Sequence, residues 1–367
     1  MKEKKHKYII LAGGLTGGPV KPLIAIAKQW QTLDRRITPV IVDVKNSVSL
    51  SIAHDENIKW QRIITGKIRR YFSWKNFFSP LLILFGFVQS IYILVKYRPV
   101  IVLGAGGFVQ LPLIITAWFF RIPRYIHQQD VLVTLSNQLC APFANLITTT
   151  FEFSIRDFSQ GTGLGKKYIK GTKVYWTGTP TSEPNEKLSQ ADAKKLLDLH
   201  DELPVLLVFG GGTGASQLNE IIYEALPQLS KVVQLIHVTG IGKGKVSAKQ
   251  NYSPLEFADN MHQLYSASDI VLGRAGIGTL SELAQFRKAG IIIPMPDTHQ
   301  EMNAELLYRT KSAIVLDQDS VTTEVLISTI RKILFNPELE KSLQTNIHAL
   351  FPKNADEKIV DLIIKTT

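Results

Sequence analysis

The sequence predicts an α/β protein with two Rossmann-like domains whose parallel sheets face each other across a cleft. Short apolar runs rich in β-branched residues recur along the chain and end in glycine, at residues 7–14, 100–104, 205–212 and 270–274. Helical patterns separate these runs, which is typical of parallel sheets covered on both faces. Two glycine-rich turns, residues 13–18 and 210–215, each follow a predicted strand. Such turns place backbone N–H groups at the carboxyl edge of a sheet, where ligands bind.

Length and composition agree with two domains. The chain has 367 residues, of which 45% are hydrophobic, enough for two packed cores. The boundary is expected near Gly178-Thr179-Pro180, because turn-forming residues follow and a helical pattern then begins. Cys140 is the only cysteine, which excludes an internal disulfide and indicates a buried thiol in a reducing compartment. The charged residues 1–7 lead directly into a strand, without the apolar segment of a signal peptide.

Positive charge is concentrated in the N-terminal half. Residues 1–175 contain 24 Lys and Arg against 8 Asp and Glu, whereas residues 176–367 contain 18 against 23. Residues 57–129 contain no acidic residue. A surface of this kind can bind nucleic acid or anionic lipid. The chain has no RNA-binding signature and no zinc-ligand spacing, so lipid is favoured and no nucleic-acid partner is expected.

Aromatic and basic residues are interleaved over residues 67–80, directly before an apolar run from Leu81 to Val95. Aromatic rings beside Lys and Arg suit the bilayer interface. The apolar run is shorter than the roughly 20 residues that a spanning helix needs, and one face of it is expected to be buried in a core. The sequence therefore predicts peripheral attachment to an anionic membrane surface through Arg69, Arg70, Trp74, Phe77 and Phe78.

A further set of residues predicts a pocket for a nucleotide sugar. Residues 274–282 read RAGIGTLSE, a glycine turn that opens a helix, and its N–H groups together with the helix dipole can bind phosphate. Glu282 lies two turns into this helix and can accept hydrogen bonds from a ribose, while the amides of Gln300 and Asn303 can reach a hexose. A glycine loop alone is more often an ordinary strand-to-helix turn, so the prediction depends on the combination.

Taken in order, the motifs resemble the MurG-type N-acetylglucosaminyltransferases of glycosyltransferase family 28, which have the GT-B fold and convert lipid I to lipid II in peptidoglycan synthesis. Residues 210–219 are similar to the family's GGSQGAxxLN loop, residues 274–282 to RAGxxTxxE and residues 299–304 to HQxxNA. Residues 256–261 resemble the segment that borders the uracil, and residues 104–108 resemble the GxGGY loop. The resemblance covers nearly the whole chain.

The resemblance implies a division of labour between the domains. Residues 1–178 would form the acceptor and membrane-binding domain, with a C-terminal helix, about residues 350–367, packing back on it. Residues 179–349 would bind the UDP-sugar. The acceptor loops would contain Gly104, Gly106, Gly107 and Asn137. The residues expected to bind UDP-GlcNAc are Thr16, Gly17, Gly18, Gly212, Thr213, Gly214, Ala215, Ala258, Arg274, Gly276, Thr279, Glu282, Gln300 and Asn303.

The N-terminal half departs from the family pattern at three informative places. The family's first loop, GGTGGH, ends in a histidine that is a proposed base, whereas here it reads GGLTGGP, with an additional Leu15 and with Pro19 in the histidine position. The family's HEQN is His127-Gln-Gln-Asp130, and its GNPxR is GTPTS at residues 178–182, without the arginine. The donor site is therefore expected to be kept and the acceptor site to be altered.

The base of the reaction is the open question. An inverting transfer needs a base for the acceptor hydroxyl and donors for the departing diphosphate. Proline cannot take a proton, so the catalytic candidates are Asp130 and His127. Either can equally be structural, His127 as a hydrogen-bonding residue beneath the acceptor loop and Asp130 as a turn or helix cap. No paired aspartates with metal geometry are evident, so we expect neither a metal nor a cofactor.

These observations predict a peripheral enzyme of the cytoplasmic face of the cell membrane that moves GlcNAc from UDP-GlcNAc to a polyprenyl-diphosphate-linked sugar. Two alternatives keep the donor site: a transferase with another lipid-linked acceptor, and a UDP-sugar-binding homologue with impaired catalysis. An NAD-dependent oxidoreductase would explain residues 13–18 alone, and that turn is a poor G-x-G-x-x-G. The C-terminal motifs therefore favour a transferase.

Overall fold

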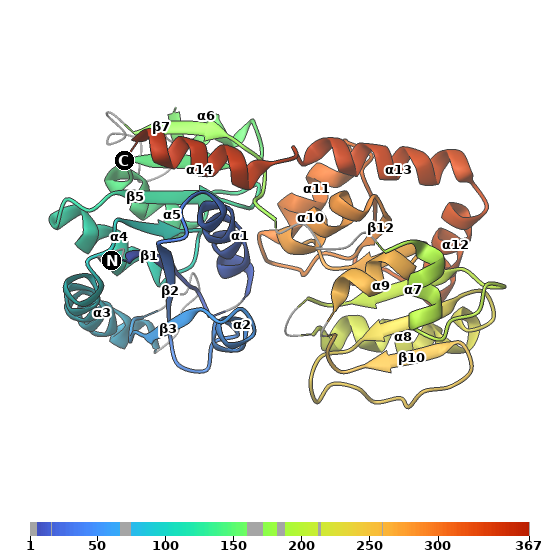
Figure 1. The fold of residues 1–367 in the computed structure, drawn as a ribbon. Helices are drawn as coiled ribbons and strands as arrows, with labels where there is room; N and C mark the ends of the chain where they lie inside the picture. The colour runs from blue at the N-terminus through green and yellow to red at the C-terminus, as the bar shows by residue number, and fades with distance from the viewer. Residues whose placement is uncertain are drawn as a thin grey trace. The chain divides into compact units, whose positions relative to one another are not determined.

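The protein is represented by a computed structural model that describes residues 6–15, 17–66, 75–159, 172–181, 188–211, 214–258 and 260–366, without the side chains of residues 75–80 and 159. The chain forms two compact units, residues 1–182 with 352–367 and residues 183–351 (Figure 1). Each unit contains a parallel sheet with helices on its faces, which confirms the prediction of two Rossmann-like domains.

The first unit is built on seven parallel strands in the order β3-β2-β1-β4-β5-β6-β7. Their bounds are β1 (Lys7–Ala12), β2 (Ile37–Asp43), β3 (Lys59–Arg62), β4 (Ile101–Gly104), β5 (Arg124–Gln128), β6 (Leu146–Thr149) and β7 (Lys173–Trp176). The helices are α1 (Gly17–Leu33), α2 (Ser49–Asp55), α3 (Lys75–Tyr97), α4 (Gln110–Phe119), α5 (Leu135–Cys140), the 3-10 turn η1 (Ala141–Phe143), α6 (Ser154–Ser159) and α14 (Ala355–Thr366). The strand order reverses between β1 and β4, so the loops after these two strands lie where such sheets usually bind ligands.

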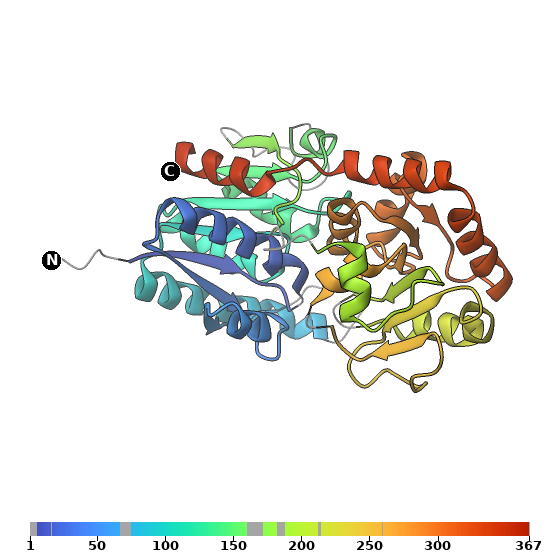
Figure 2. The same cartoon turned by 45° about the vertical axis from the view of Figure 1, so that its right-hand side comes forward.

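Helices cover both faces of this sheet. Successive side chains of a strand point to opposite faces, so the apolar residues of β1 need a packing partner on each side. Ile9 and Leu11 of β1 pack with α1 and α14, whereas Ile10 and Ala12 pack with α3 and α4. Figure 2 shows α14, at the end of the chain, lying along α1. The first strand and the last helix are thus joined in one core, and β1 is buried on both faces.

The second unit has six parallel strands in the order β10-β9-β8-β11-β12-β13. Their bounds are β8 (Val205–Phe209), β9 (Gln234–Val238), β10 (Tyr252–Leu255), β11 (Ile270–Gly273), β12 (Ala289–Ile292) and β13 (Ile314–Val315). The helices are α7 (Gln190–Leu196), α8 (Ser216–Leu229), α9 (Met261–Ala267), α10 (Ile277–Phe286), α11 (Gln300–Arg309), α12 (Thr323–Leu334) and α13 (Pro337–Leu350). The order reverses between β8 and β11, which again marks the expected ligand site.

Several residues singled out by the sequence lie outside the described part of the chain. These are Thr16, Arg69, Arg70, Trp74, Gly212 and Thr213, and the side chains of Phe77 and Phe78. The apolar run from Leu81 to Val95 forms most of α3. Over the described residues, no helix combines the length and the apolar character needed to cross a membrane.

Candidate active site

Two glycine loops meet at the carboxyl edge of the first sheet. The loop after β1 and the loop after β4 are so close that a Cβ on Gly107 would lie 2.2 Å from the carbonyl oxygen of Gly13, and one on Gly14 would lie 2.8 Å from the Cα of Gly107. Gly106 has a φ of 91°, which favours glycine. The backbones of the two glycine loops therefore touch because neither carries a side chain at the contact.

Asp43, the last residue of β2, holds the first of these loops. Its carboxylate is fully buried and accepts hydrogen bonds from the N–H groups of Gly14 (3.3 Å), Leu15 (3.2 Å) and Val44 (2.7 Å). In a dinucleotide-binding fold, an acidic residue near this position binds a ribose. Here its oxygens are bound by the protein's own backbone, which is a physical argument against the oxidoreductase alternative.

Buried amide side chains connect the second glycine loop to the loop after β5. Gln110 accepts from the N–H of Gly106 (3.1 Å) and donates to Oδ1 of Asn137 (2.7 Å). Asn137 in turn donates to Oε1 of Gln128 (2.7 Å) and to the carbonyl of His127 (3.0 Å). The three amides are fully buried, and buried polar networks of this kind fix the geometry of the groups they join. Asn137 thus links the helix start after the second glycine loop to β5.

His127 lies in β5, inside the sheet, and is fully buried. Its Nδ1 is 2.8 Å from the hydroxyl of Thr148 and its Nε2 is 3.3 Å from the hydroxyl of Thr150. Burial lowers the pKa of His127 to about 3, because the charged imidazolium loses its hydration there. The ring is therefore neutral at physiological pH, with both nitrogens beside hydroxyl groups.

Asp130 follows β5 in a loop and is half-buried, unlike His127. Gln128 donates from Nε2 to the carbonyl oxygens of Asp130 (2.7 Å) and Leu132 (2.8 Å). A glutamate in the place of Gln128 has no N–H with which to make these two bonds. The Gln128 amide thus fixes the backbone of the loop that carries the Asp130 carboxylate.

We expect acid to destabilise the protein from about pH 6.5 downwards. Burial lowers the pKa of His127 to about 3 and that of His237 to about 4, both from 6.5. Below pH 6.5 the unfolded chain binds protons that the folded state does not, so the free energy of unfolding falls by about 1.4 kcal/mol per pH unit for each histidine until the folded pKa is reached. Urea unfolding at several pH values measures the slope. His127→Gln should reduce it, and His54→Gln, which removes an exposed histidine, should not.

A glycine loop also follows β8 in the second unit. Gly211 and Gly214 have φ values of 91° and 68°, and a Cβ on Gly214 would lie 2.4 Å from the carbonyl oxygen of Thr239. Nζ of Lys243 donates to the carbonyl of Gly214 at 3.1 Å. The loops after β8 and β9 are therefore packed together, with Ala215 at the N-cap position of α8 and a lysine ammonium beside the glycine loop.

A buried network beneath these loops was not predicted from the sequence. His237 Nε2 is 3.0 Å from Oδ1 of Asn219, and Nδ1 is 3.2 Å from the hydroxyl of Tyr252. Asn219 Nδ2 donates to the carbonyl of Thr239 (3.0 Å). Because Thr239 also contacts Gly214, the network sets the position of the glycine loop from below. Asn219 is the last residue of the GGxxGAxxLN pattern, and its place in this motif was the only sequence signal that could have pointed to the network.

The loops after β11 and β12 are joined by two buried side chains. Nη1 of Arg274, a residue only 3% exposed, donates to the carbonyls of Ile293 and Pro294, both at 3.0 Å. Asn303 of α11 is fully buried and donates to the carbonyl of Ala275 (2.9 Å). The RAG turn and the segment before α11, predicted from separate motifs, therefore lie together. In this arrangement Arg274 supports the backbone of the loop.

Glu282 lies on α10, which begins after Gly276 at the carboxyl end of β11. It is half-buried, beside the phenol of Tyr265; burial and the Glu282 carboxylate together raise the pKa of Tyr265 well above its usual value. The Tyr265 ring is stacked on Phe286, with ring centroids 5.1 Å apart. Thr279 is buried in the same turn, whereas a Cβ on Gly276 would meet nothing within 4 Å. The space beside Gly276 at the start of α10 is thus unfilled, and the same helix carries the Glu282 carboxylate.

Two of the remaining predicted donor residues, Ala258 and Gln300, lie in segments that follow strands of the second sheet. Ala258 is half-buried in the segment after β10, where Glu256 accepts from the N–H of Gly242 (3.2 Å). Oε1 of Gln300, at the start of α11, accepts from the N–H of Met295 (3.1 Å). Gly17 and Gly18 open α1 in the first unit. Among the described residues, no group of three or more His, Cys, Asp and Glu is placed to hold a metal ion.

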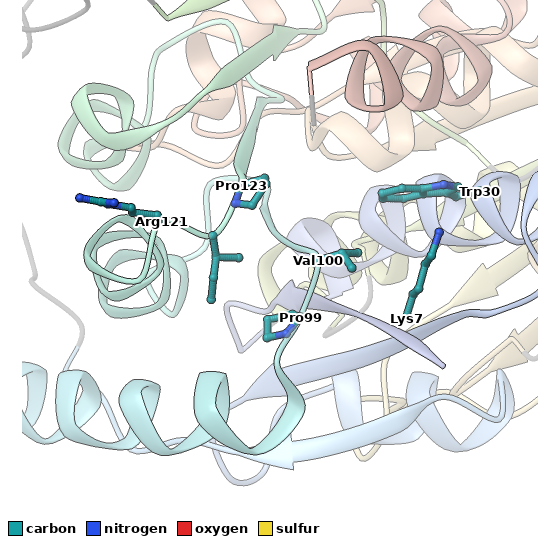
Figure 3. A pocket seen from close by; sticks show the side chains of 7 residues that line it. Lys7, Trp30, Pro99, Val100, Arg121 and Pro123 are labelled. Carbon is teal, nitrogen blue, oxygen red and sulfur yellow. The ribbon is translucent and has the colours of Figure 1, made fainter. Parts of the chain in front are cut away.

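A cavity of about 410 Å³ lies at the other edge of the first sheet. Its lining comes from the amino ends of β1, β4 and β5 and from α1: Lys7, Trp30, Pro99, Val100, Arg121, Ile122 and Pro123. In Figure 3 Arg121 extends away from Lys7 and Trp30, and Lys7 is paired with Asp34 at 3.0 Å. The cavity is therefore separate from the glycine loops, which lie at the carboxyl edge.

Comparisons with known proteins identify the family. Residues 9–149 match the glycosyltransferase family 28 N-terminal domain and residues 205–361 match the C-terminal domain. Relatives named UDP-N-acetylglucosamine–N-acetylmuramyl-(pentapeptide) pyrophosphoryl-undecaprenol N-acetylglucosamine transferase include proteins from Clostridium novyi (31% identical; 98% of this chain and 99% of the relative covered) and Legionella pneumophila (30%; 97% and 96%).

Solved structures share the fold. MurG from Acinetobacter baumannii has a TM-score of 0.70 at 24% identity, covering 98% of this chain and 99% of that one. A UDP co-structure of MnaA from S. aureus has a TM-score of 0.66 at 14% identity, covering 98% and 96%. The two family domains and the full-length relatives show that the chain belongs to glycosyltransferase family 28 and is a hexosyltransferase of GT-B fold.

Proposed function

We propose that this protein transfers GlcNAc from UDP-GlcNAc to the sugar of a polyprenyl-diphosphate-linked acceptor, lipid I, with inversion and without a metal ion. The observation that carries the proposal is that the full length of the chain matches relatives named for this reaction. The arrangement of the second unit supports it, since a glycine loop, an open helix start and a carboxylate follow the adjacent strands β8 and β11.

The donor would be held at this edge of the second sheet. Gly214 and Ala215, together with Gly212 and Thr213, would approach the diphosphate, and the start of α10 at Gly276 would offer N–H groups to it. Glu282 would accept hydrogen bonds from the ribose. Gln300 and Asn303 would contact the sugar, and Ala258 would border the uracil. Arg274 would act by holding the loop after β12, given its bonds to backbone carbonyls. Thr279 completes the proposed donor residues of the second unit, and the part of Thr16, Gly17 and Gly18 of the first unit in binding UDP-GlcNAc stays a prediction.

Asp130 is the better of the two candidate bases. His127 is fully buried between two threonine hydroxyls and is neutral, so its ring has no exposed surface for an acceptor hydroxyl. Asp130 is half-buried on a loop that Gln128 shapes. The glycine loops with Gly104, Gly106 and Gly107 would then hold the acceptor, with Asn137 beneath them.

The first unit has an apolar face suited to a membrane. Along α3, a stripe of side chains each at least 46% exposed consists of Leu81, Leu84, Phe85, Val88, Ile91, Tyr92 and Val95. Helix α4 packs against α3 (Figure 1). It ends at a second exposed group, Trp118, Phe119 and Phe120. Exposed apolar patches of this extent mark interaction sites, and Lys96, Arg98 and Arg121 are exposed beside it. We propose peripheral attachment of this face to the cytoplasmic leaflet, together with the segment from Arg69 to Phe78.

Replacing Leu84 and Val88 by glutamate should release the protein from vesicles of anionic phospholipid. Burying one such side chain contributes about 1.5–3 kcal/mol, so the double variant should bind at least tenfold more weakly in a sedimentation assay, with UDP affinity unchanged. Phe335→Glu introduces the same change at an 81% exposed side chain of the second unit and should bind like the wild type. If the double variant binds vesicles as well as the wild type, the proposal that this face attaches to the membrane is wrong.

Incubation with UDP-GlcNAc and a short-chain lipid I tests the reaction itself. The proposal predicts UDP release together with a GlcNAc-containing disaccharide product. If UDP binds and another lipid-linked sugar gives product in place of lipid I, the alternative acceptor is correct. If UDP binds and no acceptor gives product, the protein is a UDP-sugar-binding homologue.

A further inference from the structure

Leu15, the residue that lengthens the first glycine loop, has an unusual backbone conformation. Its φ is 76°, in the left-handed region that side chains with a Cβ avoid. Two hydrogen bonds fix it there: its N–H donates to Oδ1 of Asp43 (3.2 Å), and its carbonyl accepts from the N–H of Val48 (3.0 Å). Strained residues that are held by their surroundings often occur at ligand sites. The side chain of Leu15 is 39% exposed.

Asp43 determines what this loop can offer to a ligand. Its buried carboxylate binds the N–H groups of Gly14 and Leu15, and a Cβ on Gly13 would lie 2.3 Å from Oδ2, so the loop is packed directly on the carboxylate. Two N–H groups that could face a phosphate are thereby occupied by an anion of the protein. The loop presents the leucine side chain in their place.

The same aspartate adjoins the segment that leads to the apolar face. Its backbone carbonyl accepts from the N–H of Ile63 (2.9 Å), and the next residue, Ile64, donates from its N–H to Oε1 of Gln89 on α3 (2.6 Å). Ile64 is 38% exposed, and Gly86 of α3 packs against Thr65. Asp43 is thus bonded both to the loop that carries the exposed Leu15 and to the segment that carries the exposed Ile64, and this segment is bonded to α3, whose exposed stripe includes Phe85.

We propose that Leu15 is a specificity-determining residue that contacts the polyprenyl chain of the acceptor, and that Asp43 is the positioning residue that holds it in place. The inference rests on the proposed function, because it names the part of the acceptor that this loop meets. An apolar chain suits the observed surface, since the loop offers a hydrocarbon side chain while the N–H groups of Gly14 and Leu15 are already bound by Asp43.

The test compares two lipid I analogues, one with a geranyl and one with a methyl group on the diphosphate. We expect the wild type to prefer the geranyl acceptor. Leu15→Ala should reduce this preference, as the ratio of kcat/KM values and as the ratio of Kd values from calorimetry, by about three- to tenfold, because methyl groups that shield the chain from water are lost. The KM for UDP-GlcNAc should not change. Asp43→Asn should reduce the preference similarly by releasing the loop.

Leu33→Ala is the matched control, since it truncates a 65% exposed leucine at the end of α1 and should leave both ratios unchanged. If Leu15→Ala lowers kcat/KM and affinity equally for both acceptors, the residue is structural and the proposal is wrong. If Asp43→Asn does not fold, the Leu15 variant still decides. A wild type that binds UDP but transfers to neither acceptor overturns the proposed function, while the ratio of Kd values still tests Leu15.

Discussion

Glu282→Ala is expected to weaken the binding of UDP at least tenfold. In the proposed site this carboxylate accepts hydrogen bonds from the ribose hydroxyls, and each hydrogen bond to a charged group contributes about 1.5–3 kcal/mol. The neighbouring phenol of Tyr265, held by its stacking on Phe286, remains in place in the variant, so the loss reflects the missing carboxylate. Isothermal titration calorimetry with UDP measures the effect directly.

Glu305→Ala provides the control for charge. Glu305 lies on α11, exposed, in an ion pair with Arg309, and exposed pairs of this kind contribute little to stability. Its removal changes the net charge of the second unit by the same amount and should leave UDP affinity intact. Unchanged UDP affinity in Glu282→Ala would remove Glu282 from the donor site, whatever the acceptor proves to be.

The strands that could be recognised from the sequence are the central ones, between which the strand order of each sheet reverses. β1, β4, β8 and β11 are central strands buried on both faces, so they read as continuous apolar runs, and each runs into a glycine-containing turn that a loop at the switch point requires. Edge strands lack this signature. β3 reads KWQR and β7 reads KVYW, and neither differs from a surface loop until its neighbour in the sheet is known.

The residues proposed for the donor site could be singled out from the sequence more easily than the residues that hold their loops in place. The glycine turns, the helix starts that follow them and Glu282 lie within short motifs, so they can be recognised from residues that are close in the sequence. The network of His237, Asn219 and Tyr252 joins residues 15 to 18 positions apart, and Asp43 reaches a loop 28 positions away. Long-range contacts of this kind follow from the strand order, which no single motif encodes. For His127, the sequence left open whether the residue is a base or a structural hydrogen-bonding residue. Its complete burial, which favours the structural role, could be seen only in the fold.

The last prediction concerns the proton. Asp130→Asn is expected to lower turnover about a hundred- to ten-thousand-fold, the range that a positioned base contributes, with little change in UDP affinity. Asparagine keeps the size of the side chain and cannot accept the proton at neutral pH, while Gln128 still holds the loop through the backbone carbonyl of residue 130. Single-turnover transfer to short-chain lipid I measures the rate.

Two further variants separate the alternatives. Pro19→His alone should not restore the rate of Asp130→Asn fully, because Leu15 is held by Asp43 and changes the path of the loop that would aim the histidine. A wild-type rate in Asp130→Asn would instead point to His127, even though that ring is buried and lies between Thr148 and Thr150. If neither substitution affects turnover and no acceptor gives product, the donor pocket serves binding, and the chemistry was lost with the histidine that Pro19 replaces.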